Sequence, residues 1–163
     1  MRKYLRITLF FVAMLSIGFT ATGQIGVTST YYNHPVECIS VELDGSLTLR
    51  VSGNGRNRAD ALEQARKNAV YTVIFKGVDV RGQNPMMSKP LILEVNAEQK
   101  YQYFFNPFFT DGGKYKKFIS KEDTRGGSNV RQKGSKQVEY TVTIRVNRSQ
   151  LKDYLIENNI IKP

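Results

Sequence analysis

The fold is decided by residues 47–77, which read LTLRVSGNGRNRADALEQARKNAVYTVIFKG. Apolar and polar residues alternate over 47–51, and this pattern predicts a half-buried strand. Gly53-Asn54-Gly55 breaks the alternation, and Asn57 is placed to cap a helix over 58–76. Alanines recur at every fourth position of that helix, which predicts a stripe that lies close against a sheet. The small residues of this helix are Ala61, Ala65 and Ala69 on the stripe and Gly77 at its end.

A second strand is predicted immediately before this stretch. Residues 36–43 alternate in the same way, and Asp44-Gly45 separates the two alternating runs. Both turn residues tolerate a positive φ, so we expect an antiparallel hairpin. Cys38 lies in the first strand and is expected to be buried there. The apolar residues predicted to share one face of that strand are Ile39, Val41 and Leu43.

Two short elements are expected in the middle of the chain. A loop over 78–90 leads into a strand over 91–95. Asn96 is placed to cap a helix over 97–105, and Pro107 is expected to end it.

Three further elements complete the predicted fold. A strand over 115–120 is followed by a long, cleanly alternating strand over 137–147. Asn147 and Gln150 resemble a capping box, which predicts a last helix over 148–158. The predicted order is ββ-α-β-α-β-β-α. It indicates an α+β two-layer sandwich, with a mostly antiparallel sheet and about three helices on one face.

The N-terminus has the pattern of a secretory signal peptide. Basic residues precede an apolar run over 7–19, and small residues close the segment at 21–23. That run is shorter than the roughly 20 apolar residues of a membrane-spanning helix, so cleavage is favoured over an uncleaved anchor. No cysteine follows the run, so no lipid anchor is expected. The predicted organisation is a signal peptide (1–23), an N-terminal arm (24–35) and a single α+β domain (36–163).

Composition restricts the chemistry that this chain can perform. Its 163 residues include one Cys and one His, too few for a Cys/His zinc site or a disulfide framework. Arg58 stands where a dinucleotide-binding fingerprint needs Gly or Ala, so a tight turn at Gly53-Asn54-Gly55 is favoured over a phosphate cradle. His34 has no evident partner, and no G-x-S-x-G motif is present. We therefore predict no catalytic, cofactor-binding or metal-binding residue, and no enzyme activity.

A run of aromatic residues and a run of basic residues lie side by side in the sequence. Six of the nine residues from Tyr101 to Phe109 are Phe or Tyr, and they form either a second core cluster or a partly exposed contact surface. The basic run over 114–136 is either a solvated loop or a surface for an anionic partner. The predicted partner-binding residues are Phe108, Phe109, Lys114, Lys116, Lys117, Arg125, Arg131 and Lys133.

Residues 47–77 resemble a family of small Gram-negative envelope domains. The resemblance rests on a strand that ends in Gly-x-Gly and a helix with the pattern A-D-A-x-x-x-A, here Ala59-Asp60-Ala61 and Ala65. The family includes the N-terminal domain of the flagellar assembly T-protein, the activator lipoproteins of penicillin-binding proteins and the curli secretion lipoprotein. Its lipoprotein members carry a lipobox cysteine that this chain lacks. The resemblance implies a non-catalytic role that assists an envelope machine.

These patterns predict a basic exported protein of the periplasm, or of the periplasmic face of the outer membrane, in a Gram-negative bacterium. The formal net charge of the full chain is +10. Export removes nucleic acid as the expected partner, which leaves an envelope protein, with anionic lipid or glycan as the alternative. We expect an accessory or assembly factor without a cofactor. The second hypothesis is a small-ligand or lipid-binding protein that uses the aromatic cluster 101–109 and the adjacent basic hairpin, and the third is an unrecognised hydrolase.

Overall fold

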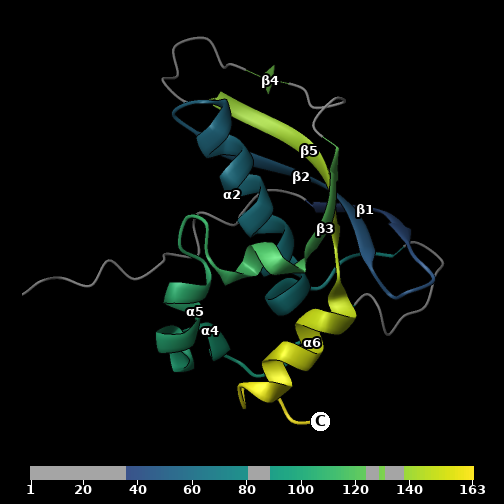
Figure 1. The fold of residues 1–163 in the computed structure, drawn as a ribbon, viewed down its shortest axis with the longest axis vertical. Coiled ribbons are helices and arrows are strands. Elements are labelled where there is room, and N and C mark those ends of the chain that lie inside the picture. The colour runs from purple at the N-terminus through teal and green to yellow at the C-terminus, as the bar shows by residue number, and fades with distance from the viewer. Residues whose placement is uncertain (1–35, 81–88, 124–128, 131–137) are drawn as a thin grey trace, which may run out of the picture.

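The protein is an α+β domain in which an antiparallel sheet has helices packed against it (Figure 1). The computed structural model describes residues 36–80, 89–123, 129–130 and 138–163. The predicted signal peptide and N-terminal arm lie outside these residues. Four strands follow one another in the order β1-β2-β5-β3, and the short β4 also pairs with β5. The strands are β1 (Val36–Val41), β2 (Leu47–Gly55), β3 (Ile119–Asp123), β4 (Asn129–Val130) and β5 (Val138–Val146).

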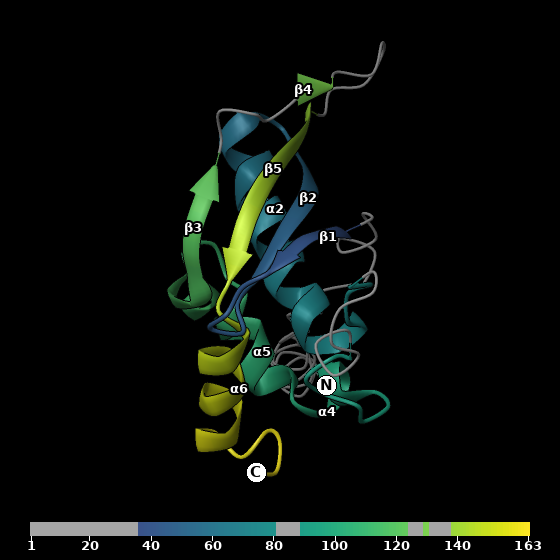
Figure 2. The same cartoon turned by 90° about the vertical axis from the view of Figure 1, so that its right-hand side faces the viewer.

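One group of helical elements lies between β2 and β3 in the sequence, and one further helix follows β5. The long helix α2 continues directly into a π-helical turn, η2, and a 3-10 turn, η3, leads into β3. Figure 2 shows α6 beyond the end of the sheet at which β5 finishes. The helical elements are α2 (Arg58–Tyr71), η2 (Thr72–Lys76), α4 (Ala97–Lys100), α5 (Gln102–Phe108), η3 (Lys114–Phe118) and α6 (Arg148–Glu157).

The centre of the sheet is the pairing of β2 with β5. The two strands pair over their full length, from Leu47 opposite Val146 to Gly55 opposite Val138. Their alternation divides buried from more exposed residues, which confirms the period-2 pattern read from the sequence. The buried row on the two strands consists of Leu47, Leu49, Val51, Tyr140, Val142, Ile144 and Val146.

Helix α2 lies against this row at very close range. A Cβ atom placed on Gly53 would be 2.2 Å from the carbonyl oxygen of Ala61 and 2.3 Å from the amide nitrogen of Ala65. A Cβ on Gly55 would be 2.4 Å from the Ala61 nitrogen. The two glycines are therefore more than a turn signal, because they continue the core-facing row of β2 and let the helix backbone touch the strand.

The predicted helix ends are confirmed. The Asn57 side chain accepts a hydrogen bond from the amide of Asp60 at 2.9 Å, and Gly77 has a φ of 77° just after η2. At the last helix, the Asn147 side chain accepts from the Gln150 amide at 3.1 Å. Local sequence patterns thus place both ends of the long helix and the start of α6.

The hairpin of β1 and β2 is confirmed, but the predicted faces of β1 are wrong in part. Gly45 has a φ of 78°, and its amide donates to the carbonyl of Glu42. The β1–β2 register shifts between Cys38 and Ser40, as at a β-bulge. The shift leaves Ile39 and Leu43 exposed, at 45% and 110%, and Cys38 half-buried against the core.

The predicted strand over 91–95 is not present. The amides of Leu91 and Ile92 donate instead to the carbonyls of Val73 and Ile74, at 3.1 and 2.9 Å. These acceptors lie in η2, so the segment is bound to the end of the helix and does not join the sheet. The predicted order ββ-α-β-α-β-β-α is therefore wrong at this point. The observed order is β1-β2-α2-α4-α5-β3-β4-β5-α6, with η2 after α2 and η3 before β3.

Two neighbouring predictions also need correction. The expected helix over 97–105 is two short helices, α4 and α5, because the chain breaks at Tyr101. Asn96 adopts a left-handed conformation, with a φ of 59°, and its side chain does not cap α4. Pro107 lies inside α5, which ends at Phe108, so the proline does not end the helix at its own position. The strand expected over 115–120 begins only at Ile119, after η3.

We predict that Gly53→Ala lowers the free energy of unfolding by about 3 kcal/mol, because the new methyl group would overlap the backbone of α2. Urea unfolding followed by circular dichroism measures the change. Asn54→Ala is the matched control, because Asn54 is exposed on the same strand, and it should change the value by no more than about 0.5 kcal/mol. Equal effects of the two substitutions would show that the close approach of α2 is unimportant.

Candidate functional site

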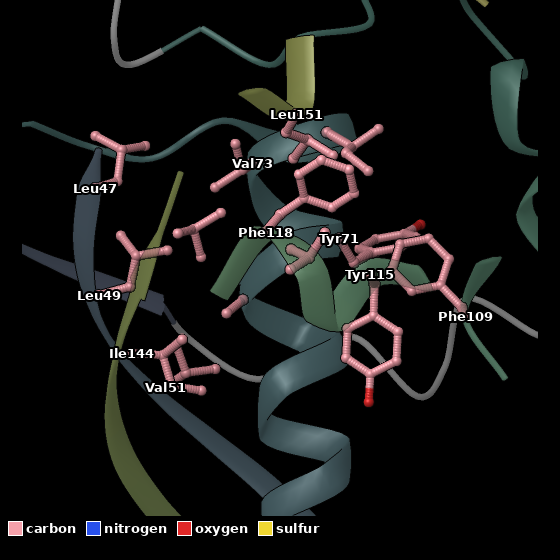
Figure 3. Close-up of a cluster of buried hydrophobic side chains, with 14 of the residues drawn as sticks. Leu47, Leu49, Val51, Tyr71, Val73, Phe109, Tyr115, Phe118, Ile144 and Leu151 are labelled. Atoms are coloured by element: carbon pink, nitrogen blue, oxygen red, sulfur yellow. The ribbon is translucent and has the colours of Figure 1, made fainter. Parts of the chain in front are cut away.

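Three of the predicted contact lysines lie together on η3. Two side chains of this short turn, those of Tyr115 and Phe118, are buried in the core. The other three, Lys114, Lys116 and Lys117, are exposed. Two aromatic anchors therefore hold three lysines in a fixed position on the surface. In Figure 3 the rings of Tyr115 and Phe118 lie among the labelled core residues beside α2.

The anchor of η3 on α2 is the carboxylate of Glu63. Its Oε1 accepts from the hydroxyl of Tyr115 and, at 2.7 Å, from the amide of Gly112. Its Oε2 is 2.9 Å from Lys116 Nζ and 3.1 Å from Arg66 Nη1. Four donors from three parts of the chain thus converge on one half-buried carboxylate.

This environment changes the acidity of both members of the central pair. Burial raises the pKa of Glu63, but the hydrogen bonds from Tyr115, Gly112, Lys116 and Arg66 outweigh it and lower the pKa from 4.5 to about 2. Burial and the adjacent Glu63 carboxylate raise the pKa of Tyr115. Tyr115 is therefore a neutral hydroxyl donor and Glu63 a charged acceptor at neutral pH. The pair holds η3 on α2, and this is a structural role.

Arg66 extends the same network to β3. Its Nε and Nη2 donate to the two carboxylate oxygens of Glu122, at 2.8 and 3.1 Å, in a bidentate pair. Lys116 and Arg66 are thus engaged by carboxylates within the domain. Lys114 and Lys117 form no ion pair with any residue in the described ranges. Among the described lysines of the predicted contact set, only these two have no carboxylate partner, so their charges are available to an external partner.

Phe108 and Phe109 were predicted to form part of the contact surface, and this prediction is wrong. Their exposed fractions are 1% and 5%. The two rings meet edge to face with centroids 4.8 Å apart, and Phe109 also stacks on Tyr115 at 6.0 Å. Both residues are buried although they are adjacent, because Phe108 packs on Tyr154 of α6 and Phe109 packs on Tyr115 of η3. The alternative reading of the run as a second core cluster is confirmed for these two residues.

The remaining predictions divide between exposed and undescribed residues. Tyr103 of the aromatic run is 81% exposed. Arg125, Arg131 and Lys133, and also His34, lie outside the described residues. Among the described residues, the structure therefore brings Lys114, Lys116 and Lys117 together on η3, and it places Phe108 and Phe109 in the core against the aromatic rings of that turn.

Sequence reasoning missed a polar hollow on the side of the sheet opposite α2. Its volume is about 180 Å³. Alternation along β5 indicated a polar face, but the register of β3 against β5 was needed to show which charges meet there. The residues that line the hollow are Glu42, Thr48, Lys121, Asp123, Thr143 and Arg145.

A reactive cysteine, a metal centre and a membrane span are three other features that the described residues can be examined for. Burial raises the pKa of the Cys38 thiol against a hydrogen bond to the Ser40 carbonyl, so the thiol is a poor nucleophile at neutral pH. Within the described ranges, no group of three or more His, Cys, Asp or Glu side chains is arranged to hold a metal ion. No helix in the described part of the chain is long and apolar enough to cross a membrane.

Comparison with known proteins finds no relative of this chain. No protein-family model matches the chain. No curated protein and no solved structure matches it either. The similarity of residues 47–77 to small envelope domains therefore stays an expectation from the sequence, and functional arguments rest on the surface itself.

We predict that the folded protein loses stability in acid as Glu63 becomes protonated. Its folded-state pKa is lowered, so its contribution is complete above about pH 4.5 and is lost as the pH falls towards 2. Glu63→Gln should lower the free energy of unfolding at pH 7 by about 1–3 kcal/mol. The variant should also lose part of the fall in stability between pH 4.5 and 2.

Urea unfolding at a series of pH values tests this prediction. Glu157→Gln is the control, since Glu157 is an exposed carboxylate at the end of α6. The control should follow the wild type at every pH. A Glu63→Gln curve parallel to the wild type would show that Glu63 does not contribute to the acid dependence.

Proposed function

We propose that this chain is a non-catalytic, exported envelope protein that binds another envelope component as an accessory or assembly factor. The observation that carries the proposal is the presentation of Lys114 and Lys117 on η3. Both are exposed without a carboxylate partner among the described residues, on a turn that is anchored by two buried rings and by Glu63. A pair of unpaired cations on an anchored turn favours an acidic protein surface, because little backbone order has to be gained on binding.

Charge supports the same conclusion. The chain has 24 Lys and Arg against 14 Asp and Glu, and the carboxylates nearest to η3 are already engaged by Lys116, Arg66 and Lys67. A positive surface of this kind increases the rate of encounter with an anionic partner and weakens its binding as salt is added. We propose the periplasm or the periplasmic face of the outer membrane as the location, because residues 1–23 have the pattern of a signal peptide.

The proposed architecture suits a binding protein. We propose that the fold is a two-layer sandwich, with the helices on one face of the sheet. The opposite face carries polar residues such as Arg50 and Thr143, and no helix in the described part of the chain covers it. Within the described ranges, such an arrangement leaves both η3 and this sheet face available to a partner.

The alternative is a small-ligand or lipid-binding protein that uses the aromatic cluster. Within that cluster, Phe104, Phe105 and Phe108 contact one another, with ring centroids 5.0–6.2 Å apart. A ligand would have to separate these rings, which costs the burial that stabilises this end of the domain. The packing therefore favours the protein-binding proposal.

We predict that charge reversal on η3 abolishes partner binding. The purified protein is used to capture its partner from a detergent extract of the native envelope, as wild type and as Lys114→Glu/Lys117→Glu. The wild type should retain a stoichiometric protein that is released by salt. The variant should lose it. Lys152→Glu/Lys162→Glu is the matched control, since it makes the same charge change at exposed positions in and after α6.

The control should retain the partner as the wild type does. Retention by all three proteins would show that η3 is not the contact surface. Capture of a lipid or glycan instead of a protein would favour the ligand-binding alternative, and thermal unfolding with the extracted molecule added would then show stabilisation.

A further inference from the structure

The two edge strands of the sheet differ in how they are protected. Within the described ranges β1 and β3 form the edges, and no strand pairs with the outer side of β1. Edge strands present unpaired N–H and C=O groups, and they commonly carry charged residues that keep other chains away. β3 carries three consecutive charged residues, Lys121, Glu122 and Asp123. β1 reads VECISV, and Glu37 is its one charged residue.

The one carboxylate of β1 does not guard this edge. Glu37 Oε2 is 2.9 Å from Arg50 Nη1 on the neighbouring strand β2, and the two residues are also paired in the strand register. Just after β1, the carboxylate of Glu42 is paired with Arg145 of β5, also at 2.9 Å. Glu37 and Glu42 are therefore both neutralised within the chain. A second strand that approaches β1 meets little repulsion from them.

The β-bulge of β1 leaves an apolar side chain exposed at the middle of this edge. Cys38 pairs with Leu49 and Ser40 pairs with Thr48, so Ile39 is the extra residue, without a partner in β2. Its side chain is 45% exposed. Bulges shield many edge strands, but this one carries an isoleucine in place of a charge. Burial of that side chain by another chain would be favourable.

The bulge also makes the two halves of β1 mirror each other. Val36 and Val41, one at each end, pair with buried residues of β2 and lie on the core side of the sheet. Glu37 and Ser40, one position further in, pair with polar residues of β2 and lie on the open side. The two central residues are apolar. The strand therefore reads apolar, polar, apolar, apolar, polar, apolar from either end.

We infer that β1 pairs antiparallel with β1 of a second copy of this chain, about a two-fold axis through the centre of the strand. In this register Val36 meets Val41 of the second copy on the core side. Glu37 meets Ser40 of the second copy on the open side, so no two carboxylates are directly opposed, which would destabilise the pair. A strand that reads alike from both ends suits its own copy, because a two-fold interface uses the same surface on both partners.

This pairing joins the two sheets and leaves the opposite edge of each free. That edge is β3, and η3 leads directly into it, so the dimer carries two sets of the η3 lysines. A partner with two acidic sites would bind the dimer more tightly than the monomer. The interface of two six-residue strands is small, so we expect a weak dimer that depends on protein concentration. The pairing needs β1 alone, so it and the proposed function can each fail without the other.

Sedimentation velocity of the purified protein, from about 1 µM to about 1 mM, tests the inference. The wild type should change from monomer to dimer as the concentration rises. Ile39→Lys should raise the dissociation constant at least about tenfold, because two ammonium groups would meet near the axis. Leu93→Lys is the matched control, since it makes the same change at an exposed residue outside the sheet, and it should dimerise as the wild type does. Circular dichroism checks that both variants are folded.

Cys38 reports the register of the pairing. In the inferred register the Cα atoms of the two Cys38 residues lie about 6 Å apart, which is within reach of a disulfide. Oxidation of the wild type in air with copper phenanthroline should therefore give a disulfide-linked dimer, whereas Ile39→Lys should give little. The reaction is run in alkaline buffer, because burial raises the pKa of this thiol.

Four results would overturn the inference. A wild type that stays monomeric over the whole range would show that β1 does not pair with its own copy. Equal dimerisation of Ile39→Lys and the wild type would place the contact elsewhere. Equal weakening by Ile39→Lys and Leu93→Lys would show that net charge decides the association. A dimer that does not crosslink through Cys38 would have a different register.

Discussion

The structure depends on the contact of the α2 backbone with the backbone of β2. Gly53 and Gly55 occupy the positions in β2 where any side chain would overlap Ala61 or Ala65 of the helix. Neither glycine has a positive φ, so they are needed for space and not for an unusual conformation. Small residues on both partners bring the helix axis closer to the sheet than ordinary apolar side chains allow. This approach places Glu63 and Arg66 within reach of η3 and β3.

The same contact explains why the core has two different ends. Where Ala61 and Ala65 meet Gly53, little apolar surface is buried and the layers are thin. At the other end, where η2, α5, η3 and α6 meet, the space is filled by aromatic rings such as Phe109, Tyr115 and Phe118 (Figure 3). Burial of such rings contributes far more apolar area per residue than alanine does. The aromatic run therefore provides the buried apolar area that the glycine–alanine contact lacks.

Local patterns were sufficient wherever neighbouring residues decide the structure. The alternation of β2 and β5, the caps at Asn57 and Asn147 and the turn at Gly45 all depend on residues a few positions apart. The strand expected over 91–95 was wrong because its amides are satisfied by η2, about 18 residues away, and no local pattern encodes that pairing. Phe109 was misplaced for a similar reason, since its burial depends on Tyr115 and Tyr71. The lysines of η3 were found from composition, whereas the engagement of Lys116 by Glu63 required the fold.

The charged surfaces of the domain follow from how the fold distributes its acidic and basic residues. On the open face of the sheet, Arg50 is paired with Glu37 and Arg145 with Glu42, so the acidic partners lie towards β1. On the helical side, Glu63 and Glu122 engage Arg66 and Lys116. Positive charge is thus neutralised within the domain on both sides of β3, while Lys121 on β3 and Lys114 and Lys117 on η3 form no ion pair in the described ranges. Lys114, Lys117 and Lys121 are therefore among the exposed cations that the fold leaves without a carboxylate partner in the described part of the chain.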